Sequence, residues 1–125
     1  MESPVRLNTL NLATLIAVTF AASAAAADCF RLNDVNAHSI GDNKTMYLAV
    51  GRHDIYRVSM KGACLGGATS SDPIITESFG SGPICRPIDL NLKIASGVGE
   101  IACIVDKFEK LTPEQIAAIP KKQRP

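Results

Sequence analysis

The stretch CLGGATSSDPIITESFGSGPIC, from Cys64 to Cys85, decides how the rest of the chain is interpreted. It contains two of the four cysteines, two turns rich in Gly and Ser, and the run Ile74 to Phe79 between those turns. A β-branched run that is bounded by turn residues is typical of a strand. We therefore expect a covalently closed unit of turn, strand and turn inside a small β protein.

The cysteines predict two disulfides. The chain has 125 residues, and its four cysteines are Cys29, Cys64, Cys85 and Cys103. An even number of cysteines in a short exported chain usually indicates a disulfide framework. No C-x2-C pair is present to begin a zinc site or a redox motif, so we predict no metal and no cofactor. Four cysteines allow three pairings. We favour Cys29–Cys103 with Cys64–Cys85, because this would tie the first strand to the last and close the unit quoted above.

The N-terminal segment predicts export. Residues 7–27 carry no charge, Arg6 precedes them, and Ala25 and Ala27 supply small residues before a cleavage point. This pattern is that of a signal peptide, residues 1–27, cleaved after Ala27. Its second half is too weakly hydrophobic for a membrane anchor, so we expect no membrane span in the mature form. The domain would cover residues 28–120, followed by a basic tail, 121–125, that we expect to be frayed. The formal net charge of +1 gives no footprint for nucleic acid.

Alternating apolar residues predict the strands. Thr45 to Val50 and Ile55 to Met60 alternate on either side of a Gly-containing turn, which indicates an antiparallel hairpin. Leu90, Leu92 and Ile94 alternate in the same way. We predict further strands at 29–32, 74–79 and 100–108, and a loop at 33–43, where Asn, Asp, Ser and Gly are frequent.

The C-terminal part predicts one short helix. Thr112, Pro113 and Gln115 occupy the positions of an N-cap, a first helical residue and a capping-box partner, and Pro120 would end the helix after Ile119. The expected fold class is therefore mainly β: a small antiparallel barrel or sandwich of about six strands, with two disulfides and a short C-terminal helix.

The chain resembles a family of short exported bacterial proteins known only as a domain of unknown function. The resemblance rests on CFRLNDV (29–35), VGRHDIYRVSM (50–60), GPIC (82–85) and CIVDKFEKLTPEQIAAIP (103–120). Ile104 departs from the family pattern, in which we would expect Pro after the last cysteine. The resemblance implies a periplasmic or secreted location and supports two disulfides. It implies no activity, ligand or catalytic residue.

The remaining polar residues suggest binding in preference to catalysis. Arg52, His53 and Asp54 lie in the predicted hairpin turn and form a candidate binding loop, although an ordinary solvated turn would have the same composition. No G-x-S-x-G elbow is present, so we do not expect an enzyme. We predict a non-enzymatic binding or inhibitory module of the bacterial cell envelope, with an envelope protein or a small ligand as partner. The alternatives are a structural or accessory component of an envelope assembly, and a small hydrolase that uses dispersed His, Asp and Ser residues.

Overall fold

A computed structural model describes residues 28–78, 82–97 and 99–125. The predicted signal peptide and its cleavage point after Ala27 lie outside these residues, as does Phe79, the last residue of the strand predicted at 74–79. Among the helices of the described residues, none combines the length and the apolar character needed to cross a bilayer.

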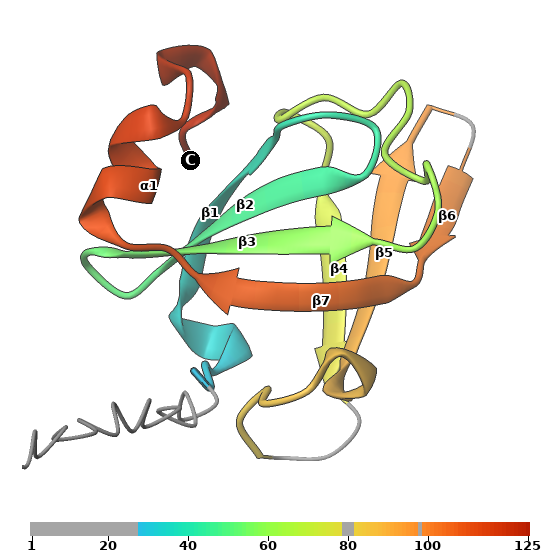
Figure 1. The fold of residues 1–125 in the computed structure, drawn as a ribbon. Coiled ribbons are helices and arrows are strands. Elements are labelled where there is room, and N and C mark those ends of the chain that lie inside the picture. The colour runs from blue at the N-terminus through green and yellow to red at the C-terminus, as the bar shows by residue number, and fades with distance from the viewer. Residues whose placement is uncertain (1–27, 79–81, 98) are drawn as a thin grey trace, which may run out of the picture.

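The described chain forms two antiparallel sheets, which Figure 1 shows one in front of the other with their strands crossing steeply. The strand orders are β1-β2-β3-β7 and β4-β5-β6. The strands are β1 (Val35–Ile40), β2 (Thr45–Val50), β3 (Asp54–Met60), β4 (Ile74–Ser78), β5 (Leu90–Ser96), β6 (Gly99–Cys103) and β7 (Val105–Lys110). The helical elements are η1 (Leu32–Asp34), η2 (Pro87–Asp89), α1 (Pro113–Ala118) and η3 (Lys121–Gln123). The mainly β fold is confirmed as a sandwich-like arrangement, and the barrel alternative is wrong because the sheets do not close on each other.

The predicted hairpin is confirmed as β2 and β3. Met46 lies opposite Val58 and Leu48 lies opposite Tyr56, and all four side chains are buried. The turn between the strands begins at Gly51, whose φ of 61° is a left-handed conformation that glycine adopts without steric strain. Leu90, Leu92 and Ile94 of β5 point inward as predicted and complete the core from the second sheet.

An aromatic cluster closes one end of the core. Phe30 lies 4.9 Å from Tyr56 and 5.4 Å from Phe108, measured between ring centroids. Phe30 was predicted to lie in a first strand at 29–32, but only its single bridge to Ile84 is strand-like, and η1 follows at Leu32. The prediction was wrong because the chain enters η1 at Leu32, so pairing does not extend beyond the bridge.

The loop predicted at 33–43 is also wrong, since it contains the edge strand β1. Residues of this strand do not form turns but make hydrogen bonds with a loop that crosses its outer edge. His38 Nε2 donates to the carbonyl oxygen of Asp72 at 3.0 Å, and the backbone N–H of Ile40 donates to Ser70 Oγ at 3.0 Å. A composition rich in Asn, His and Ser therefore marks a covered edge here, and composition alone does not separate that case from a loop.

The strand predicted at 100–108 divides at Ile104 into β6 and β7, which belong to different sheets. Cys103 and Val105 on either side of the break are both buried. The alternation of buried residues thus continues through the break, which is why the sequence pattern does not reveal it. The carbonyl oxygen of Ile104 accepts a hydrogen bond from the backbone N–H of Lys61 at 2.9 Å and fixes the crossing point.

Two disulfides are present as predicted, but the favoured pairing is wrong. The bonds are Cys29–Cys85 and Cys64–Cys103, in place of Cys29–Cys103 and Cys64–Cys85. The bridge between Phe30 and Ile84 brings Cys29 beside Cys85. The bond between Lys61 and Ile104 brings the end of β3 beside the end of β6, and hence Cys64 beside Cys103. The pairing depends on two contacts between segments far apart in the sequence, and strand placement alone does not supply them.

The C-terminal helix is confirmed, whereas the frayed tail is not. The hydroxyl oxygen of Thr112 accepts from the backbone N–H of Gln115 and caps α1. The side-chain oxygen of Gln115 in turn accepts from the backbone N–H of Thr112. The tail then docks on β1: Gln123 Nε2 donates to the carbonyl oxygen of Gly41 at 2.9 Å, and Ser39 Oγ donates to the carbonyl oxygen of Gln123. Arg124 donates from Nε to the carbonyl oxygen of Ile119 at 3.0 Å. Specific bonds thus hold the basic tail in place.

Peptide mapping without reduction should recover Cys29–Cys85 and Cys64–Cys103 peptides. In the chain-entropy account, removing the second bond by Cys64→Ala with Cys103→Ala should lower the free energy of unfolding by about 2–5 kcal/mol, measured by denaturant titration. Recovery of a Cys64–Cys85 peptide from the folded protein would contradict the fold.

Thr112→Ala should lower the free energy of unfolding by about 1 kcal/mol, because the N–H of Gln115 loses its capping acceptor. Thr112→Ser keeps the acceptor oxygen and is the matched control, with a loss that should stay small in the same urea titration. Equal losses in both variants would show that the methyl group of Thr112, and not the cap, supplies the stability.

Candidate functional site

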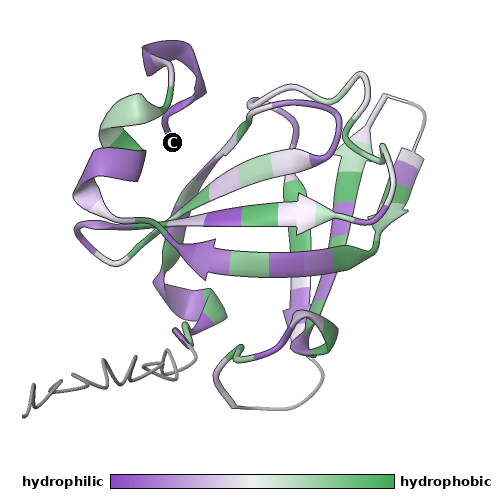
Figure 2. Cartoon of the chain, viewed as in Figure 1, coloured by the Kyte–Doolittle hydropathy of each residue, from purple (hydrophilic) through white to green (hydrophobic). Residues whose placement is uncertain are grey.

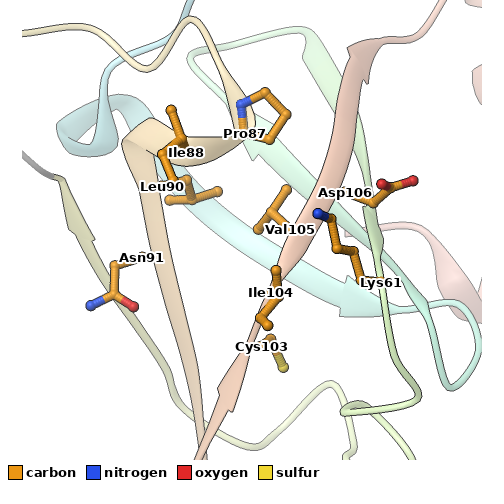
Figure 3. Close-up of a pocket in the computed structure, with 9 residues that line it drawn as sticks. All are labelled: Lys61, Pro87, Ile88, Leu90, Asn91, Cys103, Ile104, Val105 and Asp106. Carbon is orange, nitrogen blue, oxygen red and sulfur yellow. The ribbon is translucent and has the colours of Figure 1, made fainter.

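A groove of about 350 Å³ lies between η2 and the start of β7 (Figure 3). Its lining comes from four parts of the chain: the residue after β3, η2, the start of β5 and the crossing from β6 to β7. The lining residues are Lys61, Pro87, Ile88, Leu90, Asn91, Cys103, Ile104, Val105 and Asp106. The groove therefore sits where the two sheets separate.

Two large hydrophobic side chains are strongly exposed in the described part of the chain, and both line this groove. Ile88 is 70% exposed and Ile104 is 67% exposed. A single exposed apolar residue is ordinary on a protein surface. Here, however, the two residues come from different elements and flank the buried side chains of Leu90 and Val105 (Figure 3). Together they form an apolar depression that is open to solvent.

The first wall of the groove is η2, which a carboxylate holds in shape. Pro87 begins η2 with a suitable fixed φ. Asp89 Oδ2 accepts from the backbone N–H of Arg86 at 2.9 Å and from that of Cys85 at 3.3 Å, and Oδ1 accepts from the guanidinium of Arg86 at 3.0 Å. The side-chain bond from Arg86, with the backbone donors, lowers the pKa of Asp89 against a smaller opposing effect of desolvation. These bonds hold the ends of the η2 turn, and Ile88 lies at its middle position.

The second wall is the crossing at Ile104, and each wall has a disulfide beside it. Cys103 precedes Ile104 and is bonded to Cys64, whereas Cys85 lies two residues before Pro87 and is bonded to Cys29. Covalent bonds thus restrain both walls relative to the core. A ligand that binds there orders little additional structure, which favours binding in a preorganised site.

Opposite charges stand on the rim. Lys61 and Asp106 are exposed and line the groove on the side of β7 away from η2 (Figure 3). Asn91 supplies an amide on the β5 side, where its Nδ2 also donates to Glu77 at 3.0 Å. An apolar floor with a few polar groups at its edge is the usual composition of a site that binds a peptide or a small molecule.

The candidate loop at Arg52, His53 and Asp54 contributes no residue to this groove. Arg52 and His53 are exposed in the turn, whereas Asp54 is half-buried and pairs with Lys110 at 3.1 Å. The hydrogen bond from Lys110 to Asp54 raises the pKa of the lysine. Asp54 therefore has a structural partner, and a binding role for Arg52 and His53 stays a prediction.

Sequence reasoning missed Ile88 and Ile104, although a weak signal was present. In the strand predicted at 100–108, Ile104 falls on the outward side, where a large apolar residue is unexpected. Ile88 stands between Pro87 and Asp89 in a segment with turn character. Each signal alone is unremarkable, and only the fold brings the two residues to one depression. In the same described residues, no group of three or more His, Cys, Asp or Glu side chains is placed to hold a metal ion.

Removing the guanidinium beside η2 should raise the pKa of Asp89 toward its usual value of 3.8. A depressed folded pKa means that the carboxylate stabilises η2 above the unfolded pKa, and that this contribution is lost as pH falls through the folded pKa. NMR titration of Arg86→Gln should show the rise, with the Ile88 amide shifting along the same curve. Arg52→Gln removes the same charge far from η2 and should leave the pKa of Asp89 unchanged. A titration of Asp89 that does not respond to Arg86→Gln would contradict this account of η2.

Comparisons with protein-family models, with curated proteins and with solved structures gave no match to this chain. The resemblance to a family of exported bacterial proteins is therefore a proposal.

Proposed function

We propose that the protein is a non-enzymatic binding module of the bacterial cell envelope, and that its groove holds an apolar side chain of a partner protein. The observation that carries the proposal is the placement of Ile88 and Ile104 at one depression whose two walls are both anchored by disulfides. Exposed apolar surface at a restrained, concave place is typical of an interaction site.

The size of the groove favours one inserted side chain over a large cofactor. A volume of about 350 Å³ lies at the small end of ligand pockets, which span roughly 300–1,000 Å³. Burying the exposed parts of Ile88 and Ile104 would contribute on the order of 1–2 kcal/mol each. These gains require a partner that brings further contacts, and Lys61 and Asp106 on the rim offer them.

Export to the envelope is supported by two observations. Two disulfides favour an oxidising compartment, and residues 1–27 have the pattern of a signal peptide. The hydrolase alternative gains no comparable support. It would need His38 or His53 within reach of a serine in a cleft, and the Nε2 of His38 is bonded to the backbone carbonyl of Asp72.

A displayed library of random peptides, selected on the oxidised protein, tests the proposal. We expect enriched peptides to share a large apolar residue, and Ile88→Asp and Ile104→Asp each to weaken their binding at least about tenfold, because a carboxylate would then be desolvated in the groove. Arg52→Ala with His53→Ala is the control, since it alters exposed residues outside the groove and should leave affinity unchanged.

Two results would contradict the groove as the binding site. One is selected peptides that bind Ile104→Asp as tightly as the unaltered protein while both remain folded. The other is peptides that lose binding in the Arg52→Ala, His53→Ala control, which would transfer the site to the β2–β3 turn.

A further inference from the structure

The two edge strands of the four-stranded sheet differ in whether other parts of the described chain cover them. The outer edge of β1 is covered by Ser70, which accepts from Ile40, and by Gln123, which bonds to Gly41. At the opposite edge, β7 is the last strand of the sheet. Among the described residues, no hydrogen bond is formed by the backbone groups of Phe108 and Lys110 that point outward from this edge. Uncovered strand edges are places where another strand can add.

The register shows which groups of β7 face outward. The backbone N–H of Leu111 donates to the carbonyl oxygen of Ile55 at 2.8 Å, so this pair is hydrogen-bonded across the two strands. Antiparallel pairs alternate, which makes Arg57–Glu109 the next bonded pair and directs the N–H and C=O groups of Phe108 and Lys110 away from β3. A strand added at this edge would therefore bond at Phe108 and Lys110.

The charges along β7 are complementary to the same charges read in reverse. Residues 106–110 read DKFEK, and Figure 2 shows that β7 is largely hydrophilic. If a second copy of the strand pairs antiparallel about Phe108, Phe108 lies opposite Phe108, and Lys107 lies opposite Glu109, twice in the pair. Both bonds that Glu109 accepts from Arg57 go to its Oε1, so the second carboxylate oxygen accepts none of the side-chain bonds found among the described residues.

We propose that β7 is the docking edge for a second copy of this chain, which pairs with it antiparallel about a two-fold axis at Phe108. Two facts meet in this register: the outward backbone groups of Phe108 face those of the second copy's Phe108 and can form a bonded pair, and the facing charges are opposite. An isologous interface of this kind closes on two copies. The inference goes beyond the proposed function, because it concerns the strand edge and needs no groove ligand.

Lysines and bulges on an edge strand also occur as protection against pairing. β7 has Lys107 and Lys110, and its register with β3 shifts at Asp106. A purely protective edge would repel a second copy or stay neutral toward it. The order of charges here instead places Lys107 against Glu109. Pairing from 107 to 109 avoids the shifted residue, because Asp106 would lie opposite Lys110, outside that span.

Sedimentation equilibrium of the oxidised protein, over a wide range of concentrations, tests the pairing. We expect a monomer–dimer equilibrium, and Lys107→Glu should raise its dissociation constant at least about tenfold, because two facing pairs become like charges. The double variant Lys107→Glu, Glu109→Lys restores opposite pairs and should recover dimerisation. Lys44→Glu changes the same charge at an exposed turn and should have no effect.

Hydrogen exchange locates the contact. The amide of Phe108 should gain protection as the protein concentration rises, whereas the amide of Glu109, already bonded to β3, should not change. A monomer at every concentration, a Lys107→Glu variant that dimerises as tightly as the unaltered chain, or dimers without protection at Phe108 would each overturn the proposal. In the second and third cases the copies would associate through a different surface, and in the first the charges of β7 would serve as protection alone.

Discussion

The bond between Cys64 and Cys103 is the constraint on which the rest of the structure depends. Cys64 follows β3 of the first sheet, and Cys103 ends β6, the last strand of the second. The chain changes sheets at the next residue, Ile104, which is held by the backbone of Lys61. A disulfide at this place fixes how the two sheets meet, and so fixes the groove that opens where they part. The core packs around that junction and combines side chains of both sheets, such as Leu48 and Leu92, with Phe30, Tyr56 and Cys103 itself.

The strands and the helix could be predicted because their signals are local. Alternation in Thr45 to Val50 and Ile55 to Met60 identifies a hairpin, and Thr112 with Gln115 identifies a helix start, since each signal involves residues close in sequence. The missed strand β1 has a different cause. Its polar residues, such as His38, bond to loops more than thirty residues away, which local composition cannot show.

The cysteine pairing and the groove were not predictable for a related reason. Both depend on the break at Ile104, and the alternation of Cys103 and Val105 hides that break because both side chains are buried in different sheets. Only the break shows that the exposed Ile104 lines the same groove as Ile88, and the sequence alone does not place the two residues together. The groove is therefore a product of topology, whereas the hairpin is a product of pattern.

The docked tail has a consequence for how the chain reaches its final form. Gln123 binds β1 across a separation of more than eighty residues. During synthesis, β1 and β2 are made well before the tail residue Gln123, which completes the cover of the β1 edge. Contacts of such long range form late, and an uncovered edge is prone to pairing with other chains. The C-terminal residues thus complete the cover of the β1 edge last. Until then, a chaperone that binds β1 would prevent the edge from pairing with other chains.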